Sequence, residues 1–392
     1  MSATSPDVLI VGGGIVGLWC AARAVANGLS CTLVDQGGVG QGASGGLLGA
    51  LMPHQPTNWN DVKQFQLDAL LQLESDVATL EAQTGLSCGY RRCGRLIPVR
   101  TQQKHAMGLT MVSAARISWP ASTPGGTALS WQVEPHVPDP SWLSPEVAPL
   151  GCEYETLSGR VDPRSLLAAL KAFITSRIDL REHTFVSTLA PEPRVVLADG
   201  AVLTPGHVIM AAGVATFPLI APFVGDGIGR GVKGQAALVA PHQPVDPSAP
   251  ILYDGGLYVI AHGENRVAIG STSENDFIDG SATDEQLDDL IACAAILCPA
   301  LERARVVERW AGVRPKAIGR QPIIGPLPDA PGLIVAGGGF KISLGVAHAM
   351  ADAAIGFATG ASVTIPERMT VSDHMARLAR GRARTAARVK AG

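Results

Sequence analysis

The chain has 392 residues, of which 46% are hydrophobic and 17% charged, and its formal net charge is −3. A chain of this length and composition can bury a large core and is long enough for two domains. The small negative charge argues against general affinity for nucleic acid, so we predict no nucleic-acid partner.

The seven cysteines lack the Cys-x-x-Cys and histidine spacings that are typical of metal sites. We interpret them as free thiols of a cytoplasmic protein and predict no metal site. The N-terminus lacks the basic and apolar regions of an export signal. The most apolar late stretch, residues 333–358, is interrupted by glycines and by Lys341, His348 and Asp352, so we predict that it does not span a membrane.

The N-terminal residues show the pattern of a dinucleotide-binding turn. An apolar strand at 7–11 runs into Gly12-x-Gly14-x-x-Gly17, and an apolar helix follows and ends near Gly28. Gly12 permits a tight turn, Gly14 lets the backbone approach a pyrophosphate, and Gly17 lets the helix lie close to the strand. The helix N-terminus would present free N–H groups to the phosphates. A glycine turn before a helix, without a ligand, is the alternative.

A second predicted strand, residues 30–34, ends at Asp35, about 20 residues after Gly14. A carboxylate at this position can accept both hydroxyl groups of a ribose, and it would repel a 2′-phosphate. The combination of strand, glycines, helix, strand and acid favours nucleotide binding over a structural turn.

The next part of the chain changes character twice. Residues 37–46 are too rich in glycine for a helix, whereas residues 58–84 keep one apolar face and predict a long helix that ends at Gly85. Residues 86–160 are predicted to alternate short strands with proline-rich loops, as in a separate antiparallel layer.

The second half predicts a mixture of strands and helices. The expected helices span residues 164–176, 284–297 and 344–359. The expected strands are 184–189, 194–197, 207–213, 235–240, 257–261, 266–270, 310–315 and 333–336, with Asp199-Gly200 as a hairpin turn. After residue 371 the chain is basic, and we interpret this tail as a frayed, solvated terminus, with membrane or RNA contact as the alternative.

The βαβ start, the central strand layer and the βα end predict an α/β fold with two interleaved domains. We expect a Rossmann-like dinucleotide-binding domain and an antiparallel β-sheet substrate-binding domain. The nucleotide domain would comprise residues 1–85, 151–230 and 311–370. The substrate domain would comprise residues 86–150 and 231–310, and residues 371–392 would form the tail.

Several further motifs follow the glycine fingerprint in a fixed order. They are Gly42-Ala43-Ser44 with Gly49-x-x-x-Pro53, Tyr90-x-x-Cys93-Gly94-x-Leu96, Gly159-x-Val161-Asp162-Pro163, Val208-Ile209-x-Ala211-Ala212-Gly213, Gly234-Gln235, Tyr258-Val259, Arg266-Val267-x-Ile269-Gly270-Ser271-Thr272, Trp310-Ala311-Gly312-x-Arg314-Pro315 with Pro322-x-x-Gly325, and Ala336-Gly337-Gly338-Gly339-Phe340-Lys341. On these motifs the chain resembles the glycine oxidase / D-amino-acid oxidase family of FAD-dependent amine oxidoreductases. The resemblance runs from Asp7 to about Thr359 and does not indicate which particular amine is the substrate.

The resemblance implies a glycine oxidase-like, two-domain fold and a non-covalently bound FAD. The residues that would contact the FAD are Gly12, Gly14, Ile15, Val16, Gly17, Asp35, Gln36, Ala43, Ser44, Gly49, Leu51, Val186, Ala212, Gly213, Gly338, Gly339, Phe340, Lys341 and Ile342. Asp35 stands where glutamate is commoner, which puts the length of the ribose contact in doubt. Ser343 replaces a glycine that is usual after the phenylalanine loop.

Four residues are candidates for substrate chemistry. Arg314 would grip the substrate carboxylate in two places, because its guanidinium is planar and always charged. Tyr258 would help to hold the same carboxylate, Lys341 would add a positive charge near flavin and substrate, and His54 would border the flavin. The structural alternatives are a surface ion pair for Arg314, a core aromatic for Tyr258, a solvated loop lysine for Lys341 and a structural role for His54.

The resemblance implies oxidation of a small amino or imino acid that carries a carboxylate, such as glycine, sarcosine, a D-amino acid or a proline-like ring. The hydrogen on Cα would leave as hydride to flavin N5, and water would hydrolyse the imine. Oxygen or a quinone-type electron acceptor would reoxidise the flavin, and a homo-oligomer is left open. Two alternatives are a tRNA-modifying FAD oxidase that acts on a glycine-like secondary amine of a modified uridine, and a flavin-binding protein without amine turnover.

Overall fold

The computed structural model describes the backbone of residues 5–391 and the side chains of residues 5–386. The chain forms two compact units. Unit 1 comprises residues 1–45, 167–232 and 313–392, and unit 2 comprises residues 46–166 and 233–312. Each unit is therefore built from segments that are far apart in the sequence, as the interleaved pattern of the sequence predicts.

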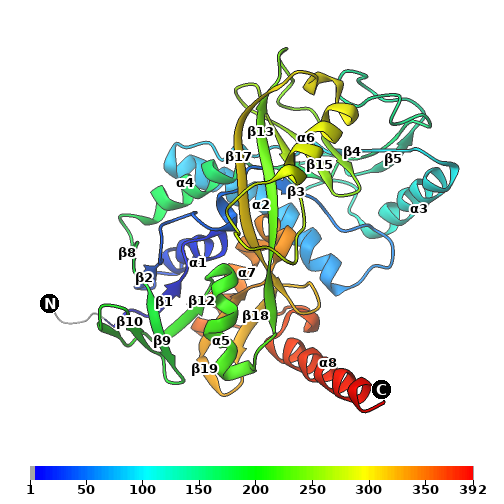
Figure 1. The fold of residues 1–392 in the computed structure, drawn as a ribbon. Coiled ribbons are helices and arrows are strands. Elements are labelled where there is room, and N and C mark those ends of the chain that lie inside the picture. Colours follow the sequence, from blue (N-terminus) through cyan, green and yellow to red (C-terminus); the bar gives the residue numbers. More distant parts are fainter. Residues whose placement is uncertain (1–4, 392) are drawn as a thin grey trace. The chain divides into compact units, whose positions relative to one another are not determined.

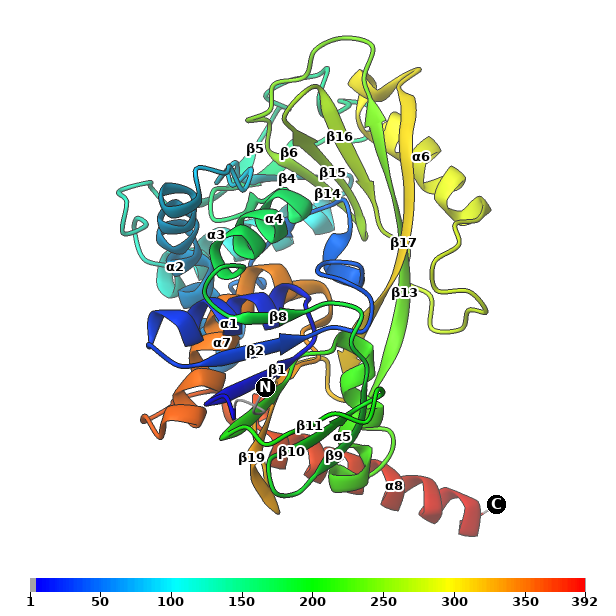
Figure 2. The same cartoon turned by 90° about the vertical axis from the view of Figure 1, so that its left-hand side faces the viewer.

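Unit 1 is built on a six-stranded sheet with the order β18-β19-β12-β1-β2-β8. Its strands are β1 (Val8–Val11), β2 (Cys31–Val34), β8 (Asp179–Arg181), β12 (His207–Met210), β18 (Ile323–Leu327) and β19 (Ala330–Gly337). All neighbouring pairs are parallel except β18 and β19. Figure 2 shows β8, β2 and β1 side by side. The predicted β1–helix–β2 unit is confirmed, with α1 (Ile15–Ala26) between the strands.

The sheet of unit 1 is covered on both faces. Helix α7 (Ser343–Thr359) packs against α1, and His348 of α7 lies fully buried with its ring edge-on to Trp19, 5.9 Å between ring centroids. The opposite face, which includes Leu9 and Val11, shares a core with the small sheet and with α5 (Thr216–Val224). The small sheet consists of β9 (Val186–Ala190), β10 (Arg194–Leu197) and β11 (Val202–Leu203).

Unit 2 contains an eight-stranded sheet with the order β17-β13-β16-β15-β14-β4-β6-β5. Its strands are β4 (Arg95–Pro98), β5 (Trp131–Glu134), β6 (Cys152–Glu155), β13 (Gly229–Ala240), β14 (Ile251–Asp254), β15 (Leu257–His262), β16 (Arg266–Gly270) and β17 (Arg305–Ala317). The pair β4–β14 is parallel, so the sheet is mixed and not purely antiparallel as predicted. A short antiparallel pair, β3 (Ala50–Leu51) with β7 (Gly159–Arg160), lies outside it. The two long strands β13 and β17 continue from unit 2 into unit 1 (Figure 1).

The two faces of this sheet bury different side chains, because neighbouring residues of a strand point to opposite sides. On one face Val259 and Ala261 share a core with Leu287 and Ala294 of α6 (Glu285–Leu297). The other face carries Ile260 in a second cluster, and Tyr258, Met52 and Trp310 pack against that cluster. The predicted helix start at Asp284 is confirmed, since its carboxylate caps α6 by accepting from the Gln286 N–H.

Helix α2 (Asp61–Thr84) begins after the capping residue Asn60 and ends at Gly85, which has a left-handed conformation, φ +70°. The predicted helix is confirmed, with a later start. Its Leu67 lies in a cluster with Met111 and Ala115 of α3 (Gln102–Ser118) and with Trp131 of β5. Helix α2 therefore belongs to the compact unit of the β5 sheet. Residues 46–85 and 151–166 also belong to compact unit 2, whereas we expected them in the nucleotide domain.

Two predicted segments differ from the structure. The prediction of strands and loops for residues 86–160 is wrong for 102–118, which form α3. The basic terminus is not frayed along its described backbone: residues Val371–Ala391 form α8. This helix is held to β18 by the buried His374, whose Nε2 lies 3.0 Å from the Pro322 carbonyl oxygen. The side chains of Arg388 and Lys390 lie outside the described residues.

The remaining elements are short or link the two units. Helix α4 (Pro163–Ile174) confirms the predicted helix near residue 164. Five short 3₁₀ turns complete the described chain: Ala43–Gly45, Gly213–Ala215, Pro299–Leu301, Phe340–Ile342 and Glu367–Met369. Within residues 5–391 one helical stretch, 340–359, is long and apolar enough to cross a membrane. Half of its most apolar window is buried inside the structure, as in the core helix of a folded domain.

Candidate functional site

The glycine turn after β1 has no room for side chains. Gly12 has φ +113°, and a Cβ atom there would lie 2.5 Å from the Ala211 carbonyl oxygen. A Cβ atom on Gly17 would lie 1.8 Å from the Gly12 carbonyl oxygen. The turn is therefore closed tightly between β12 and α1, which is the reason for glycine that the sequence predicts.

The N-terminus of α1 combines a glycine capping position with a nearby serine hydroxyl group. Its capping position is Gly14, which has no side chain to accept from the first N–H groups. The Ser44 hydroxyl oxygen accepts from the Ile15 N–H at 3.0 Å and lies beside Gly14. A helix N-terminus whose cap is a glycine, with a hydroxyl group at its side, has the donors that a pyrophosphate requires. These residues fit the predicted phosphate site.

Asp35 follows β2 and links two glycine loops. One carboxylate oxygen accepts from the Gly13 N–H at 2.6 Å, and the other accepts from the Gly37 N–H at 2.9 Å. The side chain is half-buried. Each carboxylate oxygen has a second lone pair, so these two bonds leave capacity for ribose hydroxyl groups. The donor set fits the predicted role and adds a structural one.

A second tight loop leads from β19 into α7. Gly338 has φ +69°, and a Cβ atom there would lie 2.7 Å from the Ala317 Cβ of β17. Gly339 forms a β-bridge with Lys316 of the same strand. The capping position of α7 is Ile342, whose side chain makes no capping bond, and the 3₁₀ turn Phe340–Ile342 leads directly into this helix. The residues present fit a flavin ring beside this loop.

The aromatic ring of Phe340 gathers three positive charges in unit 1. The Arg314 guanidinium carbon lies 5.7 Å from the ring centroid, Lys316 Nζ lies at 5.4 Å and Lys341 Nζ at 5.8 Å. Arg314 and Lys316 are two residues apart on β17 and therefore lie on the same side of the strand. The structure thus brings together Arg314, Phe340 and Lys341, three of the predicted site residues, and adds Lys316.

These charges affect one another. The side chain of Lys341 is exposed to solvent, but the protein atoms around its ammonium group and the charges of Arg314 and Lys316 lower its pKa to about 8. Partial burial and the charges of Arg320 and Arg230 lower the pKa of Lys316. Each named charge is positive, so this part of unit 1 has an electrostatic field that favours an anion.

Unit 2 holds the other two candidates. Tyr258 of β15 lies opposite Tyr253 of β14 and packs on the cluster that contains Ile260. The backbone N–H of His54 donates to the Gln66 side-chain oxygen at 2.7 Å, and the ring Nε2 is buried without a hydrogen-bond partner among the described residues. Burial and the nearby Lys63 lower the pKa of His54, so its ring is neutral at neutral pH.

The other predicted FAD residues are placed as follows. Gly49, with φ +70°, touches the Val161 carbonyl, and Leu51 of β3 is buried; both belong to unit 2. Val186 starts β9 in unit 1, with its side chain in the core. The remaining predicted FAD residues lie in unit 1, in or next to the helices, strands and turns described above. They are Ile15, Val16, Gln36, Ala43, Ala212, Gly213 and Ile342.

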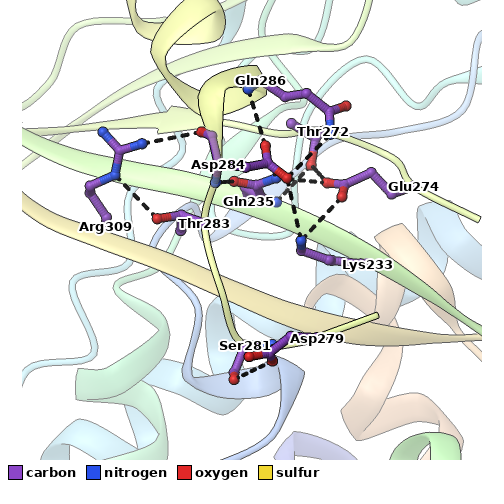
Figure 3. A network of polar contacts seen from close by, with 10 residues as sticks. All are labelled: Lys233, Gln235, Thr272, Glu274, Asp279, Ser281, Thr283, Asp284, Gln286 and Arg309. Atoms are coloured by element: carbon purple, nitrogen blue, oxygen red, sulfur yellow. Dashed lines mark hydrogen bonds and ion pairs between the residues drawn. The ribbon is translucent and has the colours of Figure 1, made fainter. Parts of the chain in front are cut away.

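Unit 2 also contains a polar network around the buried Lys233 that the sequence did not indicate (Figure 3). Lys233 Nζ lies 3.2 Å from a Glu274 carboxylate oxygen and 3.7 Å from one of Asp284. The Gln235 amide donates to both carboxylates, at 3.0 Å to Glu274 and 2.8 Å to Asp284. The network ties the segment after β16 to β13 and to the start of α6.

The described residues show neither a cluster of metal-ligating side chains nor a cysteine with the features of a reactive thiol. Among the described residues no group of three or more His, Cys, Asp and Glu side chains could hold a metal ion. The seven cysteines are free thiols, and six of them are buried. Burial raises the pKa of most of these thiols, for example that of Cys93 to about 11, which makes them poor nucleophiles.

The sequence model of the DAO family, described as FAD dependent oxidoreductase, matches residues 7–353. The chain belongs to this family. Glycine oxidase of Pseudomonas putida is 28% identical over 380 residues, which cover 92% of this chain and 96% of the relative. The crystal structure of glycine oxidase from Geobacillus kaustophilus has a TM-score of 0.81 at 21% identity and covers 94% of this chain and 98% of its own.

Iminodiacetate oxidase from Chelativorans sp. BNC1 has a similar fold, with a TM-score of 0.79 at 21% identity; the match covers 93% of this chain and 98% of that one. The family assignment confirms the predicted resemblance, the α/β fold and the FAD cofactor, and makes the protein an FAD-dependent oxidoreductase. The tight glycine turn, the helix N-terminus with Gly14 at its capping position, and Asp35 are the features of unit 1 that fit this cofactor.

Sequence reasoning missed Lys316 and Tyr253. Lys316 stands two residues after Arg314 in a predicted strand, and the alternation of strand side chains would have placed both on one side. Tyr253 precedes a Gly255-Gly256 turn and Tyr258, a hairpin pattern that places two tyrosines opposite each other.

Proposed function

We propose that this DAO-family protein oxidises a small amino or imino acid at the carbon that bears the amine. The observation that carries the proposal is the position of Arg314 beside Phe340 and Lys341, at the loop that enters α7. A guanidinium at this loop offers a two-point grip for a carboxylate. The printed names of the relatives, glycine oxidase and iminodiacetate oxidase, agree with such a substrate class.

In the proposed enzyme the FAD is bound without a covalent link. The first turn of α1 and Ser44 would hold its pyrophosphate, and Asp35 its ribose. Residues 337–342 would lie beside the flavin ring, with the N-terminus of α7 directed at developing negative charge. When bound, the FAD accepts the hydride that leaves the substrate carbon.

The side chains of the protein would position the substrate. Arg314 would fix the carboxylate, so that the Cα–H bond keeps one orientation. The Tyr258 hydroxyl stays a candidate donor to the substrate. A substrate amine that arrives neutral needs no further base, because its nitrogen lone pair assists departure of the hydride. Water then hydrolyses the imine product. His54 remains a candidate whose neutral ring borders this chemistry.

The test is an anaerobic substrate panel with the purified holoenzyme. Glycine, sarcosine, D-alanine and D-proline are mixed with the yellow protein, and loss of flavin absorbance measures oxidation of the amine. Bleaching by at least one of them supports the proposal. If none bleaches the flavin while dithionite does, the reading as a flavin protein without amine turnover replaces it. Readmission of air then measures whether oxygen serves as the acceptor.

Arg314 is tested by replacement with alanine. We expect the KM for the best substrate to rise about a hundredfold, because a charged two-point contact contributes roughly 3 kcal/mol. FAD content should change little. Arg116→Ala, which removes an exposed arginine from α3 in unit 2, is the matched control. An unchanged KM in Arg314→Ala would remove this residue from the substrate site.

A further inference from the structure

Three cations surround one phenyl ring in unit 1. Arg314, Lys316 and Lys341 each place their charge 5.8 Å or less from the centre of the Phe340 ring. The charges therefore occupy a small volume next to the loop that enters α7. The backbone around this volume is held in place by contacts between the loop and β17. β17 carries two of the cations, the Lys316–Gly339 bridge joins the loop to the strand, and Gly338 packs against Ala317.

Two of these cations have no carboxylate beside them. Among the described side chains no Asp or Glu forms an ion pair with Lys316 or Lys341, whereas Lys171 of the same unit pairs with Glu182 at 2.7 Å. Contact with an aromatic face offsets only a small part of the repulsion among three like charges. The cluster is thus arranged to receive negative charge from outside the chain.

A single carboxylate would not match all three positive charges. The planar fork of Arg314 suffices for a single carboxylate, whereas the two lysines add two further point charges, on flexible stems, near the same ring. A substrate with one carboxylate would leave the lysine charges unmatched. A second carboxylate on the same small molecule would match them.

We propose that the preferred substrate is an amine with two carboxylates, the first bound by Arg314 and the second by Lys316 together with Lys341. This inference rests on the proposed function and deepens it. The second carboxylate is not a reactant: it is bound and released unchanged, and only the Cα–H bond and the amine take part in the oxidation. It can be carried by the amine nitrogen or by the side chain of the amino acid.

The experiment compares matched amines with the holoenzyme at low salt. Sarcosine and iminodiacetate differ by a carboxylate on the nitrogen substituent, and D-alanine and D-aspartate differ by one on the side chain. We expect kcat/KM for the dicarboxylate of at least one pair to exceed that of its partner about tenfold, the size of one charged hydrogen bond. The winning pair identifies where the second carboxylate is attached. The ratio should fall as salt is added.

Lys316 provides the variant that tests the assignment. In Lys316→Met the dicarboxylate-to-monocarboxylate ratio should fall about tenfold, and Lys316→Arg should restore most of it. Lys104→Met, which removes an exposed lysine of α3, should leave the ratio unchanged. A binding readout uses malonate and acetate, which have no amine to oxidise: perturbation of the flavin spectrum should show tighter binding of malonate, and Lys316→Met should abolish the difference.

The outcomes separate the inference from the proposed function. If sarcosine or D-alanine bleaches the flavin but neither dicarboxylate is preferred, the inference fails and the proposed function stands. If malonate is preferred through Lys316 while no amine is oxidised, the second-carboxylate site stands and the proposed function fails. Binding of sulfite to the flavin provides a readout of the cofactor itself. If Lys316→Met changes this affinity but leaves the dicarboxylate-to-monocarboxylate ratio and the malonate preference unchanged, the cations act on the cofactor and the inference is overturned.

Discussion

Tyr253 and Tyr258 lie directly opposite each other on β14 and β15, with ring centroids 5.0 Å apart and ring planes at 60°. The Arg95 guanidinium lies 5.7 Å from the centre of the Tyr253 ring and pairs with the buried Glu155 at 3.0 Å. Glu155 in turn accepts from the Leu157 and Ser158 N–H groups. Tyr258 therefore stands next to a ring that is fixed by buried charges and backbone.

This pair predicts different effects for two tyrosines. Tyr258→Phe removes the hydroxyl group proposed to hold the carboxylate, so KM should rise about fivefold to tenfold at similar kcat, since a single hydrogen bond contributes about 1 kcal/mol. Tyr253→Phe keeps the edge-to-face contact and should change KM little. Steady-state kinetics with the best substrate measures both. Equal effects of the two variants would show that Tyr258 acts only as an aromatic core residue.

Asp35 predicts the strength of cofactor binding. Asp35→Asn keeps the size of the side chain but removes the charge and one of its two acceptors for the Gly13 and Gly37 N–H groups. We expect the Kd for FAD to rise at least tenfold on reconstitution of the apoprotein, because hydrogen bonds to a charged group contribute about 1.5–3 kcal/mol. Asp35→Glu restores the commoner family residue and is the control. Unchanged FAD affinity in Asp35→Asn would limit this residue to a structural role.

The Lys233–Glu274 pair predicts an acid-sensitive contribution to stability (Figure 3). Burial alone would raise the pKa of Glu274, but hydrogen bonds from Thr272, Gln235 and Lys233 outweigh it and lower the pKa below 4.5. A carboxyl group with a lowered pKa stabilises the fold above pH 4.5 and loses that contribution as the pH falls through the lowered value.

Urea unfolding of the wild type and of Glu274→Gln measures this effect. The variant should be less stable at pH 7, and the difference should shrink as the pH falls below about 4.5. Lys233→Met should cost about 3 kcal/mol at pH 7, because it leaves the Glu274 charge buried without its partner. The double variant should recover part of that loss. A difference that stays constant with pH would mean that Glu274 is not ionised in the folded protein.

Lys341 predicts a pH effect of the opposite kind. Its pKa of about 8 lies below the ordinary value of 10.5, so the folded protein disfavours the charged form. The unfavourable contribution is complete below pH 8 and disappears as the pH rises to 10.5, where the unfolded chain also loses the proton. Lys341→Met should therefore raise the Tm of the apoprotein at pH 7, and the gain should fade between pH 8 and 10.5. Lys104→Met is the control; a gain of the same size there would contradict the prediction.

The elements with strong local signals were predictable. Gly12, Gly14 and Gly17 between two apolar strands gave the nucleotide turn, and Asp284 and Gly85 marked helix ends because their cap geometry depends only on neighbouring residues. Helix α3 was missed because Gly108, Met111 and Ala115 are its only buried residues, so its apolar face is weak. The motifs around Arg314 and Lys341 predicted site residues that the fold brings to one ring.

Pairings between distant residues could not be read from local patterns. The periodicity of α2 shows that one face is buried, but not that Leu67 contacts Met111 and Trp131 in unit 2. The parallel pairing of β14 with β4 likewise depends on the path of the whole chain. Lys316 was not selected, because a lone lysine in a strand has no meaning until Phe340 is placed beside it.

The strand order in unit 1 has a consequence for synthesis of the protein. β12 leaves the ribosome long before β19, which is its neighbour in the finished sheet. Until residues 330–337 emerge, the nascent chain therefore exposes the apolar edge of β12, a ready template for pairing with other chains. Pairing between strands that are far apart in the sequence, such as β12 and β19, also slows folding. The order in which the sheet receives its strands thus leaves this edge exposed during translation.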